Sequence, residues 1–223
     1  MRFSDHLRAA GDELWEAQLN HPFIAGIADG SLSEDRFRTW LRQDYTYLLQ
    51  YVRVASIGVT RSPDEATMKR FAETAHRVLG MELDLHRGYA AEFGVSTEEL
   101  EHEEMAPATQ AYVDHLLRTG LLGDLAELPA ALLPCIWGYF WIGGEIAKRP
   151  PSPEPRYARW VELYSSDRFQ DVVDWCRELT DRLADEGGPR ARQGAERAFL
   201  TSCRCELACW DQAWDGLPEL TRS

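Results

Sequence analysis

A thiol and a phenol lie one helical turn apart in an apolar stretch rich in aromatic residues. Cys135 and Tyr139 belong to the run LLPCIWGYFWIGGEI, and side chains at i and i+4 share one face of a helix. Pro134 has no backbone N–H, which predicts a kinked helix beside the thiol. A thiol with an ordinary pKa of about 8.5 is only a few per cent thiolate at neutral pH, so catalysis would need a nearby base or hydrogen-bond donors. Cys135 is therefore either a nucleophile in a pocket or a small apolar core residue.

Two carboxylates interrupt stretches that otherwise have the pattern of buried helix faces. Asp44 falls within a series of aromatic and aliphatic residues at steps of three and four. Glu206 lies among cysteines and aromatic residues in AFLTSCRCELACWDQAW. A buried carboxyl without a cation has a raised pKa, often about 6–7, which suits a general acid or base. The alternative for both residues is structural, as an acid at the edge of the stripe or a carboxyl bonded to a core hydroxyl.

A Glu–His pair and a group of cysteines have the residue types of metal ligands. Glu82 and His86 stand at i,i+4, which fits an internal ion or hydrogen-bonded pair that ties helices together, or a metal site. Cys203, Cys205 and Cys209 form C-x-C-x3-C, in which only the last two can bind one ion from a single helix. Because the sequence has no C-x-x-C, zinc is not expected. The sequence also has no phosphate-binding glycine loop and no G-x-S-x-G.

Helical spacing of apolar residues runs along nearly the whole chain, and strand-like alternation is almost absent. We therefore predict an all-α fold, a multi-helix bundle in a single domain over residues 1–223. The seven-residue segment RPPSPEP is expected to be a loop within that domain, and Ser96 to Glu99 a capping box. Helices are expected at about Ser4–Leu19, from Ser33 to at least Val52, and at about Ser62–Glu92, Pro107–Arg118, Pro129–Lys148, Ser166–Glu186 and Pro189–Trp214, the last two split by Gly187 and Gly188.

The composition limits the possible partners. The net charge of -13 repels phosphate, so no nucleic-acid partner and no membrane partner are expected. The longest uncharged stretch, Leu128–Gly144, contains prolines and glycines and is predicted to be a buried core helix. No signal peptide is expected at the N-terminus, so the five cysteines predict reduced thiols and a cytoplasmic location.

Six segments, in the same order along the chain, resemble the TenA family of thiaminase II enzymes, which are aminopyrimidine aminohydrolases. The segments are HPFIAGIADGSLSEDRFRTWLRQDYTYL, ELDLHRGYAAEFGV, PATQAYVDHL, LLPCIWGYFWIG, YARWVELYSSDRF and SCRCELACW. Each is a weak signal alone, but six in order over nearly the whole length are specific. The thiol in the fourth segment places the resemblance in the cysteine-bearing branch of the family.

The resemblance implies an all-α, haem-oxygenase-like fold, a homotetramer and hydrolysis without a cofactor or metal. The implied partner is a small-molecule aminopyrimidine or thiamin. Cys135 would be the nucleophile, Glu206 the acid and base, and Asp44 a carboxylate that binds the pyrimidine. Four tyrosines would bind the substrate: Tyr47, Tyr112, Tyr139 and Tyr164. Cys209 departs from the pattern, because an aromatic residue often stands there in relatives.

Other functions remain open at this stage. A non-enzymatic pyrimidine-binding protein would have the same pocket, with Cys135 as a bystander. A dimetal oxidase on the same fold would use residues such as Glu82, His86 and Glu145, although all six histidines lie at or before His115. A relative of the pyrroloquinoline-type oxidases would need basic residues for several carboxylates, and the stripes here are aromatic and acidic.

Overall fold

The computed structural model describes residues 2–216, and every regular element in that range is a helix. The all-α prediction is therefore confirmed. These residues divide into two compact units. Unit 1 contains the described residues up to Leu32 together with Asp114–Leu207, and unit 2 contains Ser33–Val113 together with the described residues from Ala208. The single-domain expectation for 1–223 stays a prediction.

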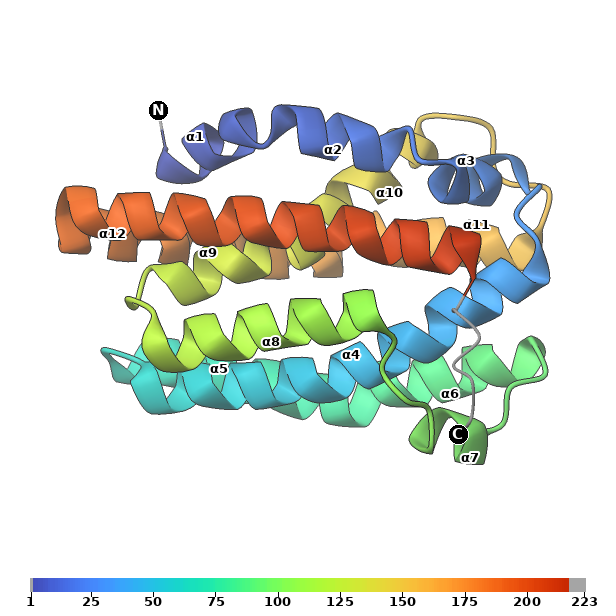
Figure 1. Cartoon of the computed structure of the whole chain (residues 1–223), viewed down its shortest axis with the longest axis horizontal. Helices are drawn as coiled ribbons and strands as arrows, with labels where there is room; N and C mark the ends of the chain where they lie inside the picture. Colours follow the sequence, from blue (N-terminus) through green and yellow to red (C-terminus); the bar gives the residue numbers. More distant parts are fainter. Residues whose placement is uncertain (1, 217–223) are drawn as a thin grey trace. The chain divides into compact units, whose positions relative to one another are not determined.

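Unit 1 is built around a cluster of aromatic rings. Its helices are α1 (Phe3–Ala10), α2 (Asp12–Leu19), α3 (Pro22–Asp29), α9 (Glu127–Leu133), the π-helical turn η2 (Pro134–Gly138), α10 (Tyr139–Ala147), α11 (Pro155–Tyr164) and α12 (Asp167–Asp215) as far as Leu207. Trp15 of α2 is almost fully buried, and its ring centroid lies 5.1 Å from that of Trp137 and 6.2 Å from that of Phe199. Figure 1 shows α1 and α2 running along α12, and this cluster joins them to α12 and η2.

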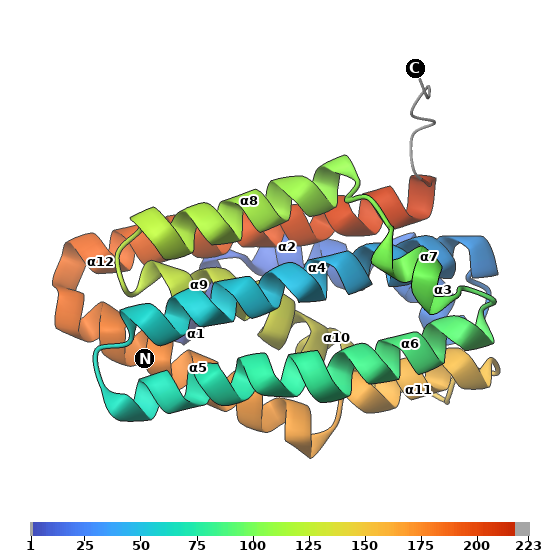
Figure 2. The same cartoon turned by 90° about the horizontal axis from the view of Figure 1, so that it is seen from below.

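Unit 2 is based on an antiparallel helix pair. Its helices are α4 (Glu34–Arg61), α5 (Glu65–Arg77), the π-helical turn η1 (Val78–Glu82), α6 (Leu83–Glu92), α7 (Thr97–Glu101) and the first part of α8 (Pro107–Leu122). Figure 2 shows the continuous run from α5 to α6 lying beside α4. Near one end of the pair, Phe37 of α4 contacts Phe93 with 4.7 Å between ring centroids, and both side chains are fully buried. Arg38 Nε donates to the Phe93 carbonyl oxygen at 2.5 Å.

The first predicted helix is two helices in the structure. α1 ends and α2 begins at Gly11, whose backbone (φ -97°, ψ 8°) leaves the helical region. A Cβ at Gly11 would lie 2.9 Å from the Phe199 ring, so glycine allows α12 to approach closely. Two short helices were not predicted from the sequence, α3 and α11. Each begins with a proline at the first helical turn, and Pro155 is also the last residue of the segment that was predicted to be a loop.

The chain reverses within α12, where Gly188 has a φ of +71° between two helical stretches and Pro189 follows. Figure 2 shows the two stretches joined by this turn. The predicted break at Gly187 and Gly188 is confirmed. A left-handed backbone conformation favours glycine, and proline then starts the next helix without losing a hydrogen bond.

Two predicted helix ends are wrong. Ser62 ends α4, and the N-cap of the next helix is Asp64, whose side chain accepts from the Thr67 N–H at 2.7 Å. α8 continues past Gly120 to Leu122. The capping box at Ser96 and Glu99 is confirmed, with hydrogen bonds in both directions.

The uncharged stretch forms one continuous helical run, Glu127–Ala147, made of α9, η2 and α10. It is the one run in residues 2–216 that is long and apolar enough to cross a membrane, and 61% of its most apolar window is buried inside the protein. It packs as a core helix of unit 1. Proline in its interior is accommodated by the π-helical turn that starts at Pro134, so the predicted kink is a widened turn rather than a break.

Candidate active site

Cys135 lies in the π-helical turn η2. Its Sγ donates to the Leu132 carbonyl oxygen at 3.1 Å, and the side chain is half-buried. A π turn contains an extra residue relative to the α-helix, so it shifts the faces on which the following side chains lie, and such turns are frequent at functional sites. The widened turn thus sets the thiol apart from an ordinary core cysteine.

The other thiols of unit 1 have raised pKa values. All five cysteines of the chain are free thiols in the structure. Burial raises the pKa of Cys176 to about 12 and that of Cys203 to about 12. Burial, followed by the charge of Glu206, raises the pKa of Cys205 to about 11. These three thiols are therefore protonated at neutral pH and unsuited to nucleophilic attack.

Tyr139 and Tyr164 meet in an aromatic cluster of unit 1. Their ring centroids are 4.9 Å apart, and Trp160 lies 6.0 Å from Tyr139 and 4.7 Å from Tyr164. Gly143 of α10 permits this contact, because a Cβ there would lie 3.0 Å from Tyr164 atoms on α11. The two predicted substrate-binding phenols of this unit are therefore held together by close helix packing, with both side chains 8% exposed.

Glu206 is a buried carboxyl on α12. It is 2% exposed, and its charge contributes to raising the pKa of the neighbouring Cys203 thiol. One helical turn earlier, the Ser202 hydroxyl is fully buried and has no hydrogen-bond partner within the part of the chain that the structure describes. A carboxyl and a hydroxyl thus stand at i and i+4 on a buried face, which is unusual in a purely apolar core.

Asp44 forms an ion pair with His86 in unit 2. The Asp44 Oδ2 and His86 Nε2 atoms are 2.6 Å apart, and the two side chains are 13% and 10% exposed. His86 therefore does tie two helices together, but its hydrogen-bonded carboxylate is Asp44 on α4. Glu82 contacts the His86 ring through its backbone carbonyl oxygen, with 3.2 Å to Nδ1.

The two remaining predicted tyrosines also meet in unit 2. The ring centroids of Tyr47 and Tyr112 are 5.3 Å apart at an interplanar angle of 33°. Tyr47 follows Asp44 by three residues on α4, so both point from one face of that helix. The Tyr112 side chain is 1% exposed.

The seven predicted residues thus fall into two sets. Unit 1 contains Cys135, Tyr139, Tyr164 and Glu206, and unit 2 contains Asp44, Tyr47 and Tyr112. The sequence reasoning missed the partner of Asp44. The signal was present in the ELDLHRGY segment, but pairing His86 with Asp44 requires the register between α6 and α4, which a single sequence does not contain.

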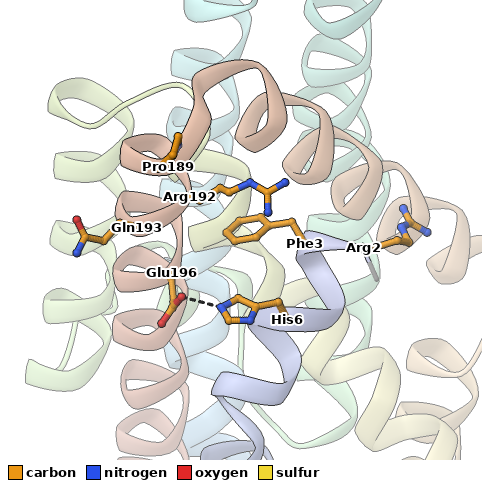
Figure 3. Close-up of a pocket in the computed structure, with 7 residues that line it drawn as sticks. All are labelled: Arg2, Phe3, His6, Pro189, Arg192, Gln193 and Glu196. Atoms are coloured by element: carbon orange, nitrogen blue, oxygen red, sulfur yellow. Dashed lines mark hydrogen bonds and ion pairs between the residues drawn. The ribbon is translucent and has the colours of Figure 1, made fainter.

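Neither a metal-binding group nor the surface groove involves the predicted site residues. Within residues 2–216 no group of three or more His, Cys, Asp or Glu side chains is arranged to hold a metal ion. A groove of about 500 Å³ lies between α1 and α12. Figure 3 shows its lining residues, all of them outside the predicted set. Its cations are matched by carboxylates: His6 with Glu196 at 2.8 Å, Arg2 with Asp181, and Arg192 with Asp185. The groove therefore has little net charge to offer an anion.

A helical fold with a thiol in a π turn, buried carboxyls and paired tyrosines has the residue types of an enzyme that acts on a small aromatic molecule. The TENA/THI-4/PQQC family matches residues 8–216, and the chain belongs to this family. The family resemblance seen in the six sequence segments is confirmed.

Curated relatives match over most of their length. The chain is 39% identical to an aminopyrimidine aminohydrolase of Halalkalibacterium halodurans, over 96% of each chain. It is 34% identical to an aminopyrimidine aminohydrolase of Bacillus subtilis, over 96% of this chain and 90% of the relative.

Solved structures agree on the fold. A TenA homologue of P. horikoshii superposes with a TM-score of 0.90 at 26% identity, covering 96% of this chain and 99% of the homologue. A haem-oxygenase-like domain of Shewanella denitrificans superposes with a TM-score of 0.76 at 14% identity, covering 96% and 93%. The latter likeness concerns the fold alone and confirms the haem-oxygenase-like prediction.

Proposed function

We propose that this protein is an aminopyrimidine aminohydrolase of thiamin salvage. It would convert 4-amino-5-aminomethyl-2-methylpyrimidine and water to the 5-hydroxymethyl pyrimidine and ammonia, and would also cleave thiamin. Support comes from two relatives of that name, 39% and 34% identical over 96% of the chain. The structural observation that carries the proposal is the half-buried Cys135 in its π-helical turn.

Cys135 is the proposed nucleophile. Direct displacement of ammonia from the exocyclic carbon is slow, because the ring does not assist the departure of so poor a leaving group. Addition of the Cys135 thiolate to ring C6 forms a C–S bond and places an electron pair where it can expel the amine from the methylene at C5. Water then adds to the exocyclic methylene, and breaking of the C–S bond restores the aromatic ring and the thiolate.

Glu206 is the proposed proton carrier. It protonates the departing amine as a general acid, then removes a proton from the water that adds to the methylene. Its side chain is 2% exposed, so the proton that it carries is passed away from bulk water. The Ser202 hydroxyl, one turn earlier on α12, is a candidate hydrogen-bond partner for that water.

Asp44 is the proposed pyrimidine ligand. Its carboxylate accepts hydrogen bonds from the 4-amino group and from a protonated ring nitrogen, which makes C6 more electrophilic. The phenols of Tyr47, Tyr112, Tyr139 and Tyr164 provide flat apolar faces for the ring and hydroxyl groups for the polar steps. These assignments rest on the family resemblance, residue by residue.

The protein is proposed to act in the cytoplasm as a homotetramer, without nucleic-acid or membrane partners. The charge of -13 supports the last point. Exposed leucines and methionines on α5, η1 and α6 are apolar surface that subunit contacts would cover: Met68, Leu79, Met81 and Leu85.

The decisive experiment measures ammonia release from 4-amino-5-aminomethyl-2-methylpyrimidine, with thiamin as the second substrate. Wild type is expected to turn over, Cys135→Ala to lose at least 100-fold in kcat (on the order of the loss of a covalent nucleophile), and Cys205→Ala to remain active. Cys205 is a matched control because it is also half-buried, and its thiol is protonated at neutral pH. Full activity of Cys135→Ala would refute covalent catalysis. Binding of the pyrimidine by wild type without turnover would instead support a carrier.

A further inference from the structure

The Asp44–His86 pair is a buried and short contact. The atoms Oδ2 and Nε2 are separated by 2.6 Å, which is in the range of charge-assisted hydrogen bonds. The Trp40 ring, one turn before Asp44 on α4, lies 6.2 Å from the His86 ring and is itself 5% exposed. Asp44 therefore contacts the imidazole where water is largely excluded. A hydrogen bond is stronger in such a place, and its direction fixes the orientation of the carboxylate.

The two ring nitrogens of His86 fix its protonation state. Nδ1 lies 3.2 Å from the Glu82 carbonyl oxygen, which can only accept, so Nδ1 carries a hydrogen. Nε2 faces a carboxylate oxygen. If Nε2 were bare, two lone pairs would oppose each other at 2.6 Å, so one proton must lie between the two groups. Since a carboxyl is a stronger acid than an imidazolium, that proton stays on Nε2, and His86 is an imidazolium that donates to the Asp44 carboxylate and to a backbone carbonyl oxygen.

The surroundings agree with that charge state. Burial by itself lowers the pKa of His86, but the hydrogen bond to Asp44 and the charges of Asp44 and Glu82 outweigh it, so the pKa is raised above its ordinary value. The charged groups that face the ring are thus Asp44 from α4 and Glu82 from η1. The next residue, Arg87, donates to the Tyr45 hydroxyl at 3.0 Å, which fixes α6 against α4 beside the pair.

We propose that His86 is the positioning residue of Asp44. As an imidazolium it donates to the Asp44 carboxylate and holds it in one orientation, so that Asp44 acts only as a hydrogen-bond acceptor. This inference rests on the proposed function, in which Asp44 binds the amino group and a ring nitrogen of the substrate. An acceptor-only carboxylate selects a 4-aminopyrimidine, which presents donors, over a 4-oxopyrimidine, which presents a carbonyl oxygen that would repel it.

The π-helical turn η1 helps to build this arrangement. It ends at Glu82 and adds an extra residue between α5 and α6, so α6 starts on a rotated face. Val78 within the turn is buried, whereas Leu79, Gly80 and Met81 are exposed. The same turn supplies the Glu82 carbonyl oxygen that holds Nδ1, which leaves Nε2 to Asp44.

The charge state is tested by ¹⁵N NMR of histidine-labelled protein over a pH titration. The His86 signal is assigned by its loss in the His86→Gln variant. We expect an imidazolium signal that persists above the ordinary midpoint of about 6.5, and a midpoint below that value in Asp44→Asn, where burial remains without the counter-charge. His115 serves as an internal comparison, because burial lowers its pKa. A neutral His86 at pH 6.5 in wild type would overturn the proposal, whatever the enzyme's activity.

The positioning role is tested by steady-state kinetics. His86→Gln keeps a donor for Asp44 but removes the charge, and His86→Leu removes both. We expect kcat/KM to fall about 10-fold in the first and about 100-fold in the second, with His76→Gln unchanged, because charge-assisted hydrogen bonds differ from neutral ones by about this factor. His76 is a matched control, since it is an exposed histidine on α5.

A second readout separates positioning from folding. Binding of a 4-amino and a 4-oxo form of the same pyrimidine is compared by calorimetry in each variant. Loss of the preference for the amino form in His86→Leu, with thermal unfolding still cooperative, supports the proposal, and an unchanged preference overturns it. If wild type binds neither pyrimidine, the proposed function fails, while the NMR titration still decides the charge of His86.

Discussion

Substitution of Gly143 by alanine tests how the contact between α10 and α11 holds the Tyr139–Tyr164 pair. A Cβ at Gly143 would lie 3.0 Å from the Tyr164 backbone carbon and 3.0 Å from its Cβ, closer than side chains pack. Gly144 is the neighbouring residue on the same helix, and a Cβ there would meet nothing within 4 Å. Alanine at either position gains about 0.8–1 kcal/mol of helix propensity. Only Gly143→Ala also pushes α11 away, at a cost of about 1–3 kcal/mol.

The propensity gain cancels when the two variants are compared, so the difference measures the contact alone. We expect Gly144→Ala to be more stable than wild type by about 1 kcal/mol, and Gly143→Ala to be less stable than Gly144→Ala by about 1–3 kcal/mol. The assay is urea unfolding followed by circular dichroism at one protein concentration. The comparison requires that the free energy of unfolding depend on urea concentration with the same slope in all variants. Equal stability of the two variants would refute the close packing of Gly143 on Tyr164. A raised KM in Gly143→Ala alone would further show that the pair contributes to substrate binding.

Three further outcomes are expected. Phe37→Ala should lower the free energy of unfolding by about 3–5 kcal/mol in urea titrations, because the ring is fully buried; a loss below 1 kcal/mol would contradict its place in the core. Asp64→Ala should cost about 0.5–2 kcal/mol through the lost N-cap bond to Thr67, and a neutral effect would contradict the start of α5 there. Cys176 and Cys203 should react with a thiol reagent at neutral pH only after the protein unfolds, because burial raises both pKa values to about 12. Mass spectrometry measures the labelling, and rapid labelling of either thiol in the native state would refute that burial.

The sequence predicted helices well where periodicity and end signals agreed. The start of α4 and the reversal at Gly187 and Gly188 follow from local chemistry, namely a serine before acidic residues and a glycine pair before proline. α3 and α11 were missed because both are short and begin with a proline, which suits the first turn of a helix but also ends the predicted loop RPPSPEP.

The candidate site was only partly accessible to sequence reasoning. Pairs on one helix, such as Cys135 and Tyr139, follow from spacing alone. The partner of Asp44 does not, because His86 reaches it across two helices and the contact depends on a π turn that shifts the register. A single extra residue in a helix leaves no periodic signal strong enough to be read in one sequence.

The interleaved composition of the two units has a consequence for synthesis on the ribosome. Unit 2 takes most of its residues from one continuous segment, Ser33–Val113, which emerges early and can begin to fold as a helix pair. Unit 1 takes its first segment, ending at Leu32, from the start of the chain and the rest from Asp114–Leu207. The contacts of α1 and α2 with α12 therefore form only after α12 has been translated. The nascent chain thus passes through a stage in which Trp15 lacks its partner Phe199, and part of its apolar surface is exposed.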